Sequence, residues 1–300
     1  MTDKDVERKP SETALFAALR RTIANKEFGN EKFGPDYLAE KFLPPHFRFF
    51  LKFKKIQANT KDKLNGFLPG LNEYMIARTA YFDHLFVNAL NTQTSQIVLL
   101  GAGYDTRAYR FANLNHDTRI FELDIAPTQD RKRKCIKSAR IKVPEFVTFI
   151  PINFNDQSLA DVLGEAGYQN HQKTLFIWEG VSYYLDAASV DRTFEFVRQA
   201  THPESSIAFD YTVSMSEENI DEYYGVREFS QTMKEHHANE ELLFSIGEGE
   251  IGSFLEQRGL KAIEHLDNED IERRFLMDED GSMLGRITGH FRFVLASRGA

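Results

Sequence analysis

Five short apolar runs separated by helical stretches constrain the fold of this 300-residue chain more than any other feature. The runs are rich in Val, Ile, Leu and Phe, and each ends at a polar residue or a glycine. Several continue without polar alternation, which fits strands buried on both faces of a parallel sheet. Such a sheet requires crossover helices, so the pattern predicts a doubly wound α/β fold. The strands are expected at Gln96 to Leu100, Arg119 to Asp124, Val147 to Pro151, Thr174 to Trp178 and Ser206 to Tyr211.

The stretches between these runs predict the crossover helices. Asp186 stands where a helix cap is expected, because its carboxylate can accept a hydrogen bond from a free N–H group of the first turn. The helices are expected at Thr106 to Phe111, Pro127 to Ser138, Leu159 to Ala166 and Ala187 to Ala200.

The two ends of the chain depart from this rhythm. The first 70 residues are helical and aromatic in pattern, with a break at Pro44-Pro45, and are expected to form a cap on the core. Residues 214–241 are polar and helix-like, and we expect them to form an insertion that covers a pocket. Apolar side chains that could line this pocket are Tyr211, Tyr223, Tyr224, Phe229 and Met233. The remaining elements are a helix from Gly249 to Arg258, ended by Gly259, and a last strand from His290 to Ala296.

Composition narrows the class of protein. A formal net charge of -8 argues against a surface built for nucleic acid, and the basic run from Arg131 to Lys134 is expected to be a solvated helix face. No apolar run reaches membrane-spanning length, and Met1 to Ser11 lacks the apolar segment of a secretion signal. A single cysteine, Cys135, is typical of a reducing compartment. We expect a cytoplasmic globular protein with no nucleic-acid or membrane partner.

A glycine-rich turn directly follows the first predicted strand and directly precedes a helix. Its sequence is Gly101-Ala-Gly103-Tyr-Asp-Thr106. Glycine permits a tight turn and the close approach of a ligand, and the start of the helix offers free N–H groups. The turn therefore predicts a ligand site, the alternative being that the two glycines serve only the change of direction.

Two carboxylates, Glu122 and Asp124, close the second predicted strand. They lie about 20 residues beyond the glycines, the separation at which a carboxylate binds ribose hydroxyls in nucleotide-binding α/β folds. We expect Asp124 to be that ligand and Glu122 to be a solvated or helix-capping acid. Thr106 stands where a dinucleotide fingerprint has glycine or alanine, which favours an adenosyl ligand without phosphates over a nicotinamide dinucleotide.

The segment from Val98 to Arg110, followed by Phe121-Glu-Leu-Asp124, resembles the leucine carboxyl methyltransferase family, which includes bacterial O-methyltransferases that act on polyketide acids. The resemblance runs from about Ala14 to the carboxyl end. Its further motifs are Arg78-Thr79, Trp178-Glu-Gly-Val-Ser-Tyr-Tyr-Leu185 and Glu240-Glu-Leu-Leu-Phe-Ser-Ile-Gly-Glu-Gly249.

The resemblance implies a Rossmann-like class I methyltransferase, with a mostly parallel seven-stranded sheet and helices on both faces. It implies one domain over residues 1–300. Within this domain we expect a helical cap (1–72), a cofactor-binding core (73–211), a lid insertion (212–247) and the C-terminal part of the sheet (248–300).

The cofactor implied by the resemblance is S-adenosyl-L-methionine, released as S-adenosyl-L-homocysteine. Arg78 matches the residue that binds the methionine carboxylate, Gly101 and Gly103 match the turn near the amino acid portion, and Asp124 matches the ribose ligand. Glu179 matches the acid beside the cofactor. Alternative roles are a surface ion pair for Arg78 and a capping or solvent-facing carboxylate for Glu179.

The adenine site departs from the family pattern, which often has Asp-Leu at the end of the third strand. Asn153-Phe154 stands there in this chain, and Asp156 is a candidate for the missing acid. Tyr183 and Tyr184 are candidates for the pocket wall, and no residue is assigned a catalytic role. No set of residues has metal-ligand spacing, because the adjacent His236 and His237 do not share a helix face.

Methyl transfer from a sulfonium is an in-line displacement, which requires alignment of the reacting atoms and exclusion of water. A carboxylate acceptor is ionised at pH 7 and needs no general base, whereas a hydroxyl acceptor does. We expect an O-methyltransferase that acts on a small-molecule acid or a protein C-terminus. The alternatives are a nicotinamide-dependent oxidoreductase and a non-catalytic adenosyl-binding protein. The identity of the acceptor and the oligomeric state do not follow from the sequence.

Overall fold

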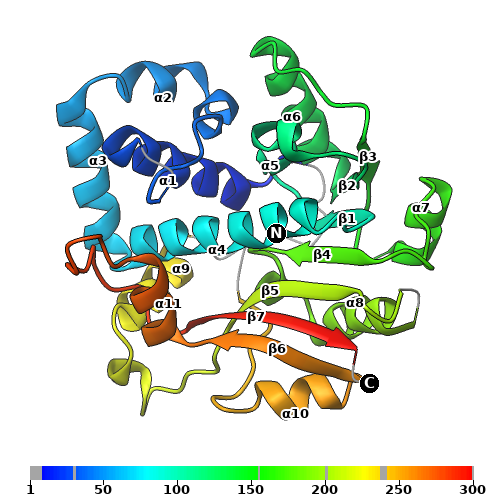
Figure 1. Cartoon of the computed structure of the whole chain (residues 1–300). Helices are drawn as coiled ribbons and strands as arrows, with labels where there is room; N and C mark the ends of the chain where they lie inside the picture. Colours follow the sequence, from blue (N-terminus) through cyan, green and yellow to red (C-terminus); the bar gives the residue numbers. More distant parts are fainter. Residues whose placement is uncertain (1–8, 30–31, 155, 200–201, 237–241, 299–300) are drawn as a thin grey trace.

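The alternating strands and helices form one seven-stranded sheet, with the strand order β3-β2-β1-β4-β5-β7-β6 (Figure 1). The computed structural model describes residues 9–29, 32–154, 156–199, 202–236 and 242–298. Strands β1 to β5 are parallel, and β7 runs antiparallel to both of its neighbours. The strands are β1 (Gln96–Leu100), β2 (Arg119–Asp124), β3 (Val147–Pro151), β4 (Thr174–Trp178), β5 (Ser206–Thr212), β6 (Leu260–Leu266) and β7 (Phe291–Arg298).

The α-helices cover both faces of this sheet and its carboxyl edge. They are α1 (Glu12–Phe28), α2 (Pro45–Phe50), α3 (Lys54–Phe67), α4 (Leu71–Asn91), α5 (Arg107–Arg110), α6 (Ala126–Ser138), α7 (Leu159–Glu165), α8 (Ala187–Gln199), α9 (Val226–His236), α10 (Ile251–Glu256) and α11 (Asn268–Phe275). Short 3-10 turns are η2 (Ala39–Phe42), η3 (Ala112–Leu114), η4 (Ser182–Tyr184) and η5 (Ile220–Glu222). None of the helices in the described ranges is both long and apolar enough to cross a bilayer.

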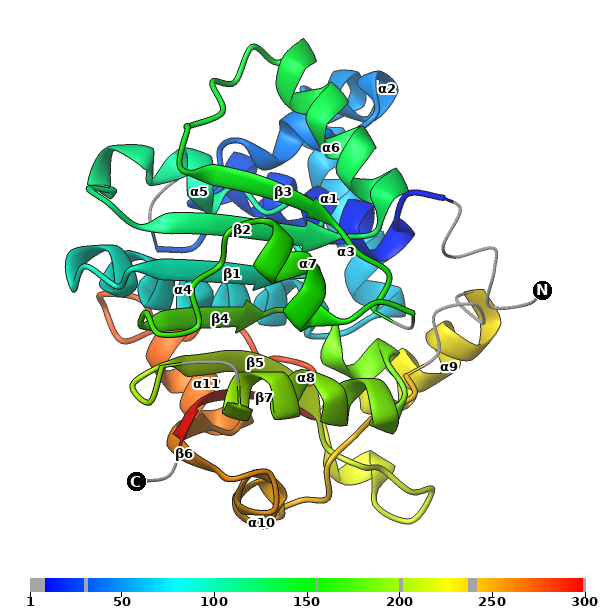
Figure 2. The ribbon, with the colours of Figure 1, turned by 90° about the vertical axis from the view of Figure 1, so that its right-hand side faces the viewer.

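Consecutive residues of the central strands point to opposite faces, and each face has its own hydrophobic cluster. Ile97 and Leu99 of β1 pack with α4 and α11, whereas Val98 and Leu100 pack with α7, α8 and α10. Figure 2 shows this layering, with α7 and α8 in front of the strands and α4 and α11 behind them. Burial on both faces explains why these strands read as continuous apolar runs.

The sequence-based expectations fail in two places. Strand β6 is not predicted, because its edge position leaves charged residues such as Lys261 exposed between apolar ones. The helix expected over 214–241 is restricted to α9 and the short turn η5, and residues 237–241 lie outside the described part. Gly225, with φ +71°, lies so close to Pro69 that a Cβ atom would come within 2.5 Å of the Pro69 carbonyl oxygen. The chain therefore changes direction there, and α9 begins at the next residue.

The helices of the amino-terminal part lie at the carboxyl edge of the sheet. Ser11 caps α1 by accepting a hydrogen bond from the Ala14 N–H at 3.0 Å, and its own N–H donates to Thr128 Oγ1 of α6 at 2.9 Å. At the far end of this edge, Thr232 Oγ1 of α9 donates to the carbonyl of Phe67 at the end of α3, at 2.9 Å. The cap and the insertion therefore meet above the strand ends (Figure 2).

Candidate functional site

The strand order reverses between β1 and β4, which are neighbours in the sheet. From β1 the chain proceeds to β2 and β3 on one side, and from β4 it proceeds to β5 on the other. The crevice outside the carboxyl ends at such a switch point is where open α/β sheets bind ligands. Gly101 follows β1 and Glu179 follows β4. Two of the residues predicted from the sequence therefore flank the switch point.

The glycine turn has a backbone conformation that other residues rarely adopt. Gly101 and Gly103 have φ values of +70° and +44°, in the left-handed region. A Cβ atom on Gly101 would lie 2.5 Å from the Val181 side chain, and one on Gly103 would lie 3.2 Å from the Ala14 side chain. Both positions therefore exclude larger side chains, and the turn lies between the start of α1 and the loop after β4.

Asp124 lies directly beside this turn. Its Oδ2 atom accepts a hydrogen bond from the Gly103 N–H at 2.6 Å, and Oδ1 accepts one from the Ile125 N–H at 2.7 Å. Burial raises the pKa of this carboxyl to about 6, although both hydrogen bonds act in the opposite direction. Each carboxylate oxygen has a further lone pair. Asp124 can therefore accept hydroxyl donors while it holds the glycine turn in place.

Glu122 has a structural role, and the expectation of a solvated or capping acid is wrong. Its side chain is fully buried, with Oε2 at 2.6 Å from the Lys132 Nζ and Oε1 accepting a hydrogen bond from the Tyr109 hydroxyl at 3.0 Å. Lys132 is also buried, so the basic run 131–134 is not solvated throughout. The two acids face the same side of the sheet, because they are two residues apart in β2, and they differ in that only Asp124 stands at the strand end.

An extended set of ion pairs lies beneath the glycine turn, and we call it the arginine network. Glu179 joins two of its branches, with Oε1 at 3.0 Å from Arg78 Nε and Oε2 at 2.7 Å from Arg107 Nη1. The network contains four arginines and five carboxylates, all largely buried, which gives a formal charge of -1. Its members are Arg21, Arg78, Arg107, Arg110, Asp36, Asp83, Asp105, Glu179 and Asp210.

Neither alternative role for the two predicted residues agrees with this arrangement. The Arg78 side chain is only 7% exposed, so it forms a buried pair and not a surface one. Glu179 is bonded to arginines on both carboxylate oxygens, so it is not a solvent-facing acid. Both residues lie at the switch point, within the network.

Asp210 belongs to this site, and the sequence analysis missed it. This fully buried carboxylate of β5 accepts a hydrogen bond from the Gly180 N–H at 2.7 Å and lies 3.4 Å from Arg78 Nη1. The hydroxyl groups of Tyr74 and Tyr183 both donate to it. The sequence did contain a signal, because Asp210 is the single charged residue in the apolar run Ser206 to Tyr211. A buried acid without a partner would be costly in free energy, so its presence there indicates a bonded carboxylate.

The two tyrosines proposed for the pocket wall differ in environment. Tyr183 is buried, and its hydroxyl contacts Arg78 and Asp210. Burial and the neighbouring Asp210 raise the pKa of Tyr183 well above its ordinary value, so the hydroxyl keeps its proton at pH 7. Tyr184 is half-buried and packs edge-on against Tyr183, with ring centroids 4.8 Å apart.

The remaining predicted residues lie at the end of β3, beside Asp124. The backbone connects the two strand ends, because the Ile152 N–H donates to the Asp124 carbonyl at 2.9 Å. Asn153 Nδ2 donates to Asp156 Oδ2 at 2.7 Å, so the candidate replacement acid is bonded to the amide that stands in the family position. Phe154 packs against the hydrophobic cluster of the α8 face.

Two side chains expected in the acceptor pocket, Tyr211 and Tyr223, lie elsewhere, since both pack in the hydrophobic cluster of the α8 face. Tyr211 points to the α8 face, and its hydroxyl is 3.1 Å from His265 Nε2 of β6. In contrast, Phe229 of α9 packs against Phe291, which stacks on Tyr74 with ring centroids 3.8 Å apart. Among the aromatic side chains of the insertion, Phe229 therefore reaches the Asp210 end of the site.

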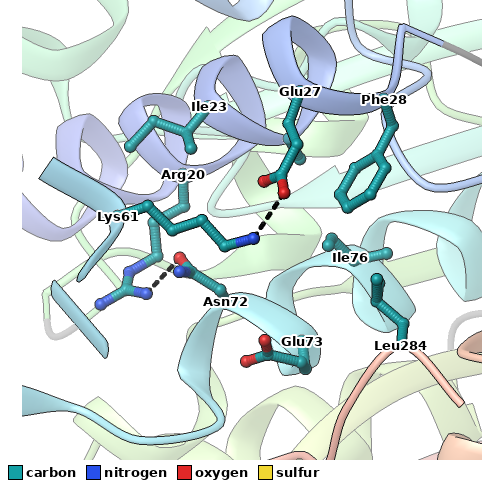
Figure 3. Close-up of a pocket in the computed structure, with 10 residues that line it drawn as sticks. Arg20, Ile23, Glu27, Phe28, Lys61, Asn72, Glu73, Ile76 and Leu284 are labelled. Carbon is teal, nitrogen blue, oxygen red and sulfur yellow. Dashed lines mark hydrogen bonds and ion pairs between the residues drawn. The ribbon is translucent and has the colours of Figure 1, made fainter. Parts of the chain in front are cut away.

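A small cleft lies between α1, α3 and α4 (Figure 3). Arg20 Nη1 donates to Asn72 Oδ1 there, and Lys61 Nζ bonds Glu27 Oε1 at 2.6 Å across the cleft. Burial lowers the pKa of Arg20 to about 9, with Glu73 acting in the opposite direction. None of the residues predicted to bind a cofactor lines this cleft.

Within the described residues, no group of three or more His, Cys, Asp or Glu side chains could hold a metal ion. The side chains of His236 and His237 lie outside the described part. The site therefore consists of a glycine turn, a carboxylate at the end of the next strand and a charged network at the switch point. This arrangement is typical of α/β proteins that bind nucleotide-like ligands at the switch point.

Comparison with known proteins identifies the family. The family model for leucine carboxyl methyltransferase matches residues 14–198. YktD of Bacillus subtilis (strain 168), named as an S-adenosyl-L-methionine-dependent methyltransferase, is 31% identical over 222 residues, covering 72% of this chain and 70% of YktD. Two relatives with similar names match over about half of their own length. The match covers 47% of the relative from Mycolicibacterium paratuberculosis and 49% of the relative from Mycobacterium avium. The chain belongs to the leucine carboxyl methyltransferase family.

Two solved structures share the fold of this chain. A protein from Thermobifida fusca described as a methyltransferase has a TM-score of 0.61 at 16% identity, covering 97% of this chain and 96% of its own. A DUF574 family protein from Streptomyces avermitilis has a TM-score of 0.63 at 14% identity, covering 98% and 99%. The fold is thus the Rossmann-like α/β fold of methyltransferases.

The protein is therefore a methyltransferase that uses S-adenosyl-L-methionine, and the nicotinamide alternative is set aside. The residues present fit this cofactor. The positive φ values of Gly101 and Gly103 form a tight turn at the switch point, and Asp124 keeps lone pairs that hydroxyl donors can use.

Proposed function

We propose that the protein transfers a methyl group to an oxygen of a carboxylate acceptor, either a small-molecule acid or a protein C-terminus. When bound, the cofactor supplies an electrophilic methyl group on a sulfonium. The task of the chain is then to hold both reactants in line and to exclude water.

Charge supports the placement of the cofactor over the arginine network. S-adenosyl-L-methionine has an ammonium, a carboxylate and a sulfonium, with a net charge of +1, which complements the network charge of -1. Arg78 would face the methionine carboxylate, with Gly101 and Gly103 beside the amino acid portion and Glu179 near its ammonium. Asp124 would accept the ribose hydroxyls. Asn153 and Phe154 would adjoin the adenine, with Tyr183 and Tyr184 as pocket wall.

The choice of a carboxylate acceptor rests on the protonation states of the side chains at the carboxyl edge of the sheet. Burial and the neighbouring Asp210 raise the pKa of Tyr74 well above its usual range, as they do for Tyr183, so both hydroxyls are donors. Burial lowers the pKa of His290, on the loop before β7, to about 3, which makes it a weak base at pH 7. Glu179 is bonded to two arginines. These described residues offer no free general base, which favours an acceptor that is already ionised.

We also propose that the parts of this single domain have different roles. Residues 1–72 would form the cap, 73–211 the cofactor-binding core, 212–247 the lid and 248–300 the C-terminal part of the sheet. The contact between Thr232 of α9 and Phe67 of α3 supports a joint cover over the acceptor. We also propose a cytoplasmic location, supported by the single free Cys135.

A methyl-transfer assay with a labelled methyl donor tests this function. The acceptor panel contains an aliphatic carboxylic acid, a peptide with a free C-terminus and a phenol. Methyl esters release methanol in mild alkali, whereas methyl ethers do not. We expect alkali-labile label on at least one acid, abolished by excess S-adenosyl-L-homocysteine. Alkali-stable label on the phenol alone would contradict the carboxylate assignment, and no label with any acceptor would favour a non-catalytic adenosyl-binding protein.

A further inference from the structure

The segment that contains α2 and the start of α3 exposes an unusual number of aromatic side chains. Phe47, Phe49, Phe50 and Phe53 are 39%, 56%, 49% and 50% exposed. Phe49 contacts two of the other rings, with centroids 5.9 Å from Phe50 and 5.7 Å from Phe53, and the ring of Phe47 contacts His46. A contiguous exposed apolar patch of this kind marks an interaction surface.

The exposed rings are not core residues that failed to pack. The same segment has its own buried side chains, Phe42, Leu43 and Leu51, which join a cluster with α1 and α6. The segment is therefore anchored through one face, and the four phenylalanines point away from it. Figures 1 and 2 place α2 at the end of the molecule opposite to β6 and α10.

The charge around these rings is opposite to that of the whole chain. No acid occurs between Glu40 and Asp62, and six bases do, in a protein with a formal net charge of -8. Four of them flank the rings directly: Lys52, Lys54 and Lys55 are exposed, and Arg48 is half-buried. We call residues 45–55 the aromatic-basic patch. Lysine is depleted at protein–protein interfaces, so this mixture does not favour a protein partner or a second copy of the chain.

We propose that the aromatic-basic patch docks the protein on the surface of a membrane that contains anionic lipids. Phenylalanine rings enter the boundary between headgroups and acyl chains, and lysine and arginine are attracted to the negative surface, so both kinds of side chain favour the same partner. The sequence-based expectation of no membrane partner rests on the lack of a spanning segment. Surface docking does not need one, because the rings penetrate only the interface.

Docking is measured by co-sedimentation of the full chain with phosphatidylcholine vesicles, with and without phosphatidylserine. We expect binding only to the vesicles that contain phosphatidylserine, and weaker binding at high salt. The variant K54E/K55E replaces two positive charges by negative ones at the start of α3. Folding should be retained, because acidic side chains are favourable in the first turn of a helix. This variant should raise the apparent Kd about tenfold or more. The variant F49S/F50S should abolish sedimentation even at low salt.

Two matched controls lie away from the patch. K173E/K261E reverses two exposed lysines, and I263S removes a side chain of β6 that is 60% exposed. Both should sediment as the unmodified protein does. The affinity for S-adenosyl-L-homocysteine should be unchanged in the patch variants, because none of their residues is assigned to the cofactor site, and this separates the test from that of the proposed function. Three results would each overturn the proposal. The first is that the protein does not sediment with vesicles, and the second is that patch and control variants lose binding equally. The third is that the protein forms a larger species without vesicles and that F49S/F50S abolishes this species.

Discussion

At the scale of single residues, the two acids at the end of β2 have different physical roles that their spacing in the sequence does not reveal. Asp124 contacts the glycine turn, whereas Glu122 forms a buried pair with Lys132. Sequence reasoning selected Asp124 because the strand end is where ligands bind. It could not identify the partner of Glu122, because the Lys132 side chain approaches from another element across a distance that only the fold determines.

Asp124 should make cofactor affinity depend on pH. Its pKa is raised to about 6 in the folded protein, so the carboxyl is protonated below that pH and must lose a proton to accept ribose hydroxyls. We expect the Kd for S-adenosyl-L-homocysteine, measured by calorimetry, to be flat above pH 7. It should rise by up to about tenfold per pH unit below pH 6. Asp124→Asn should bind more weakly by about 1.5 to 3 kcal/mol and lose this pH dependence.

The control for this experiment is Glu122→Gln. This change breaks the buried pair with Lys132 and should lower stability by about 3 to 5 kcal/mol. In the fraction that stays folded, the rise in Kd below pH 6 should persist. If Glu122→Gln removes the pH dependence and Asp124→Asn does not, the assignment of the ribose ligand is wrong.

Gly103 should be required both for the fold and for the cofactor. The Cβ atom of Gly103→Ala would lie 3.2 Å from the Ala14 side chain, in a backbone conformation that alanine rarely adopts. Gly249→Ala is a matched control, because Gly249 also has positive φ but nothing lies within 4 Å of the added atom. Both variants should lose about 1 to 2 kcal/mol of stability in urea titrations. Only Gly103→Ala should also weaken binding of S-adenosyl-L-homocysteine, and equal affinities would contradict this role.

At the scale of elements, the sequence predicts the strands best where burial is most uniform. Strands β1, β2 and β4 have the expected bounds because both of their faces are covered, which buries most of each run. Strand β3 also has the expected bounds, although it lies at the other edge of the sheet and only its Ile150 is fully buried. Strand β6 lies at the edge, and its exposed Lys261 and Ile263 give no such run. The Asp186 cap is confirmed, since its Oδ1 accepts a hydrogen bond from the Ser189 N–H at 2.6 Å. Local signals therefore predict elements, while the order in the sheet depends on packing between distant segments.

The lid should be detectable by hydrogen exchange. If the cap and the insertion close over the acceptor, S-adenosyl-L-homocysteine together with a substrate acid should slow exchange in α3 and in residues 214–236. The cofactor product alone should protect mainly Gly101 to Asp124. Residues of α10 serve as an internal reference, because this helix packs on the far side of β6 and should not respond. Protection confined to the glycine turn in both conditions would count against a lid.

At the scale of the whole molecule, the cap and the sheet share one hydrophobic core. The cluster on the α4 face joins Ala24 of α1, the central strands, Phe229 of α9 and Ile271 of α11. The arginine network crosses the same boundary, because Arg21 of α1 pairs with Asp36 and donates to the Tyr104 carbonyl at 2.8 Å. Within the described residues, these contacts connect the cap to the rest of the fold, which favours the prediction of a single domain.

This shared core leads to a prediction for unfolding. Trp178, the only tryptophan of the chain, is buried in β4, so its fluorescence reports on the sheet. Far-ultraviolet circular dichroism reports mainly on the helices, including α1, α2 and α3 of the cap. If both parts belong to one cooperative unit, the two signals should change at the same urea concentration.

Cofactor binding gives a second test of the same unit. S-adenosyl-L-homocysteine binds only the folded state and therefore stabilises it. At a ligand concentration of one hundred times the Kd, the free energy of unfolding rises by about 2.7 kcal/mol. Both transitions should then move to higher urea concentration by the same amount. A cap that folds independently would behave differently, because its circular dichroism would change first and would not respond to the ligand. Two separated transitions, with only the fluorescence transition shifted by the ligand, would therefore refute the single domain and assign residues 1–72 to a separate unit.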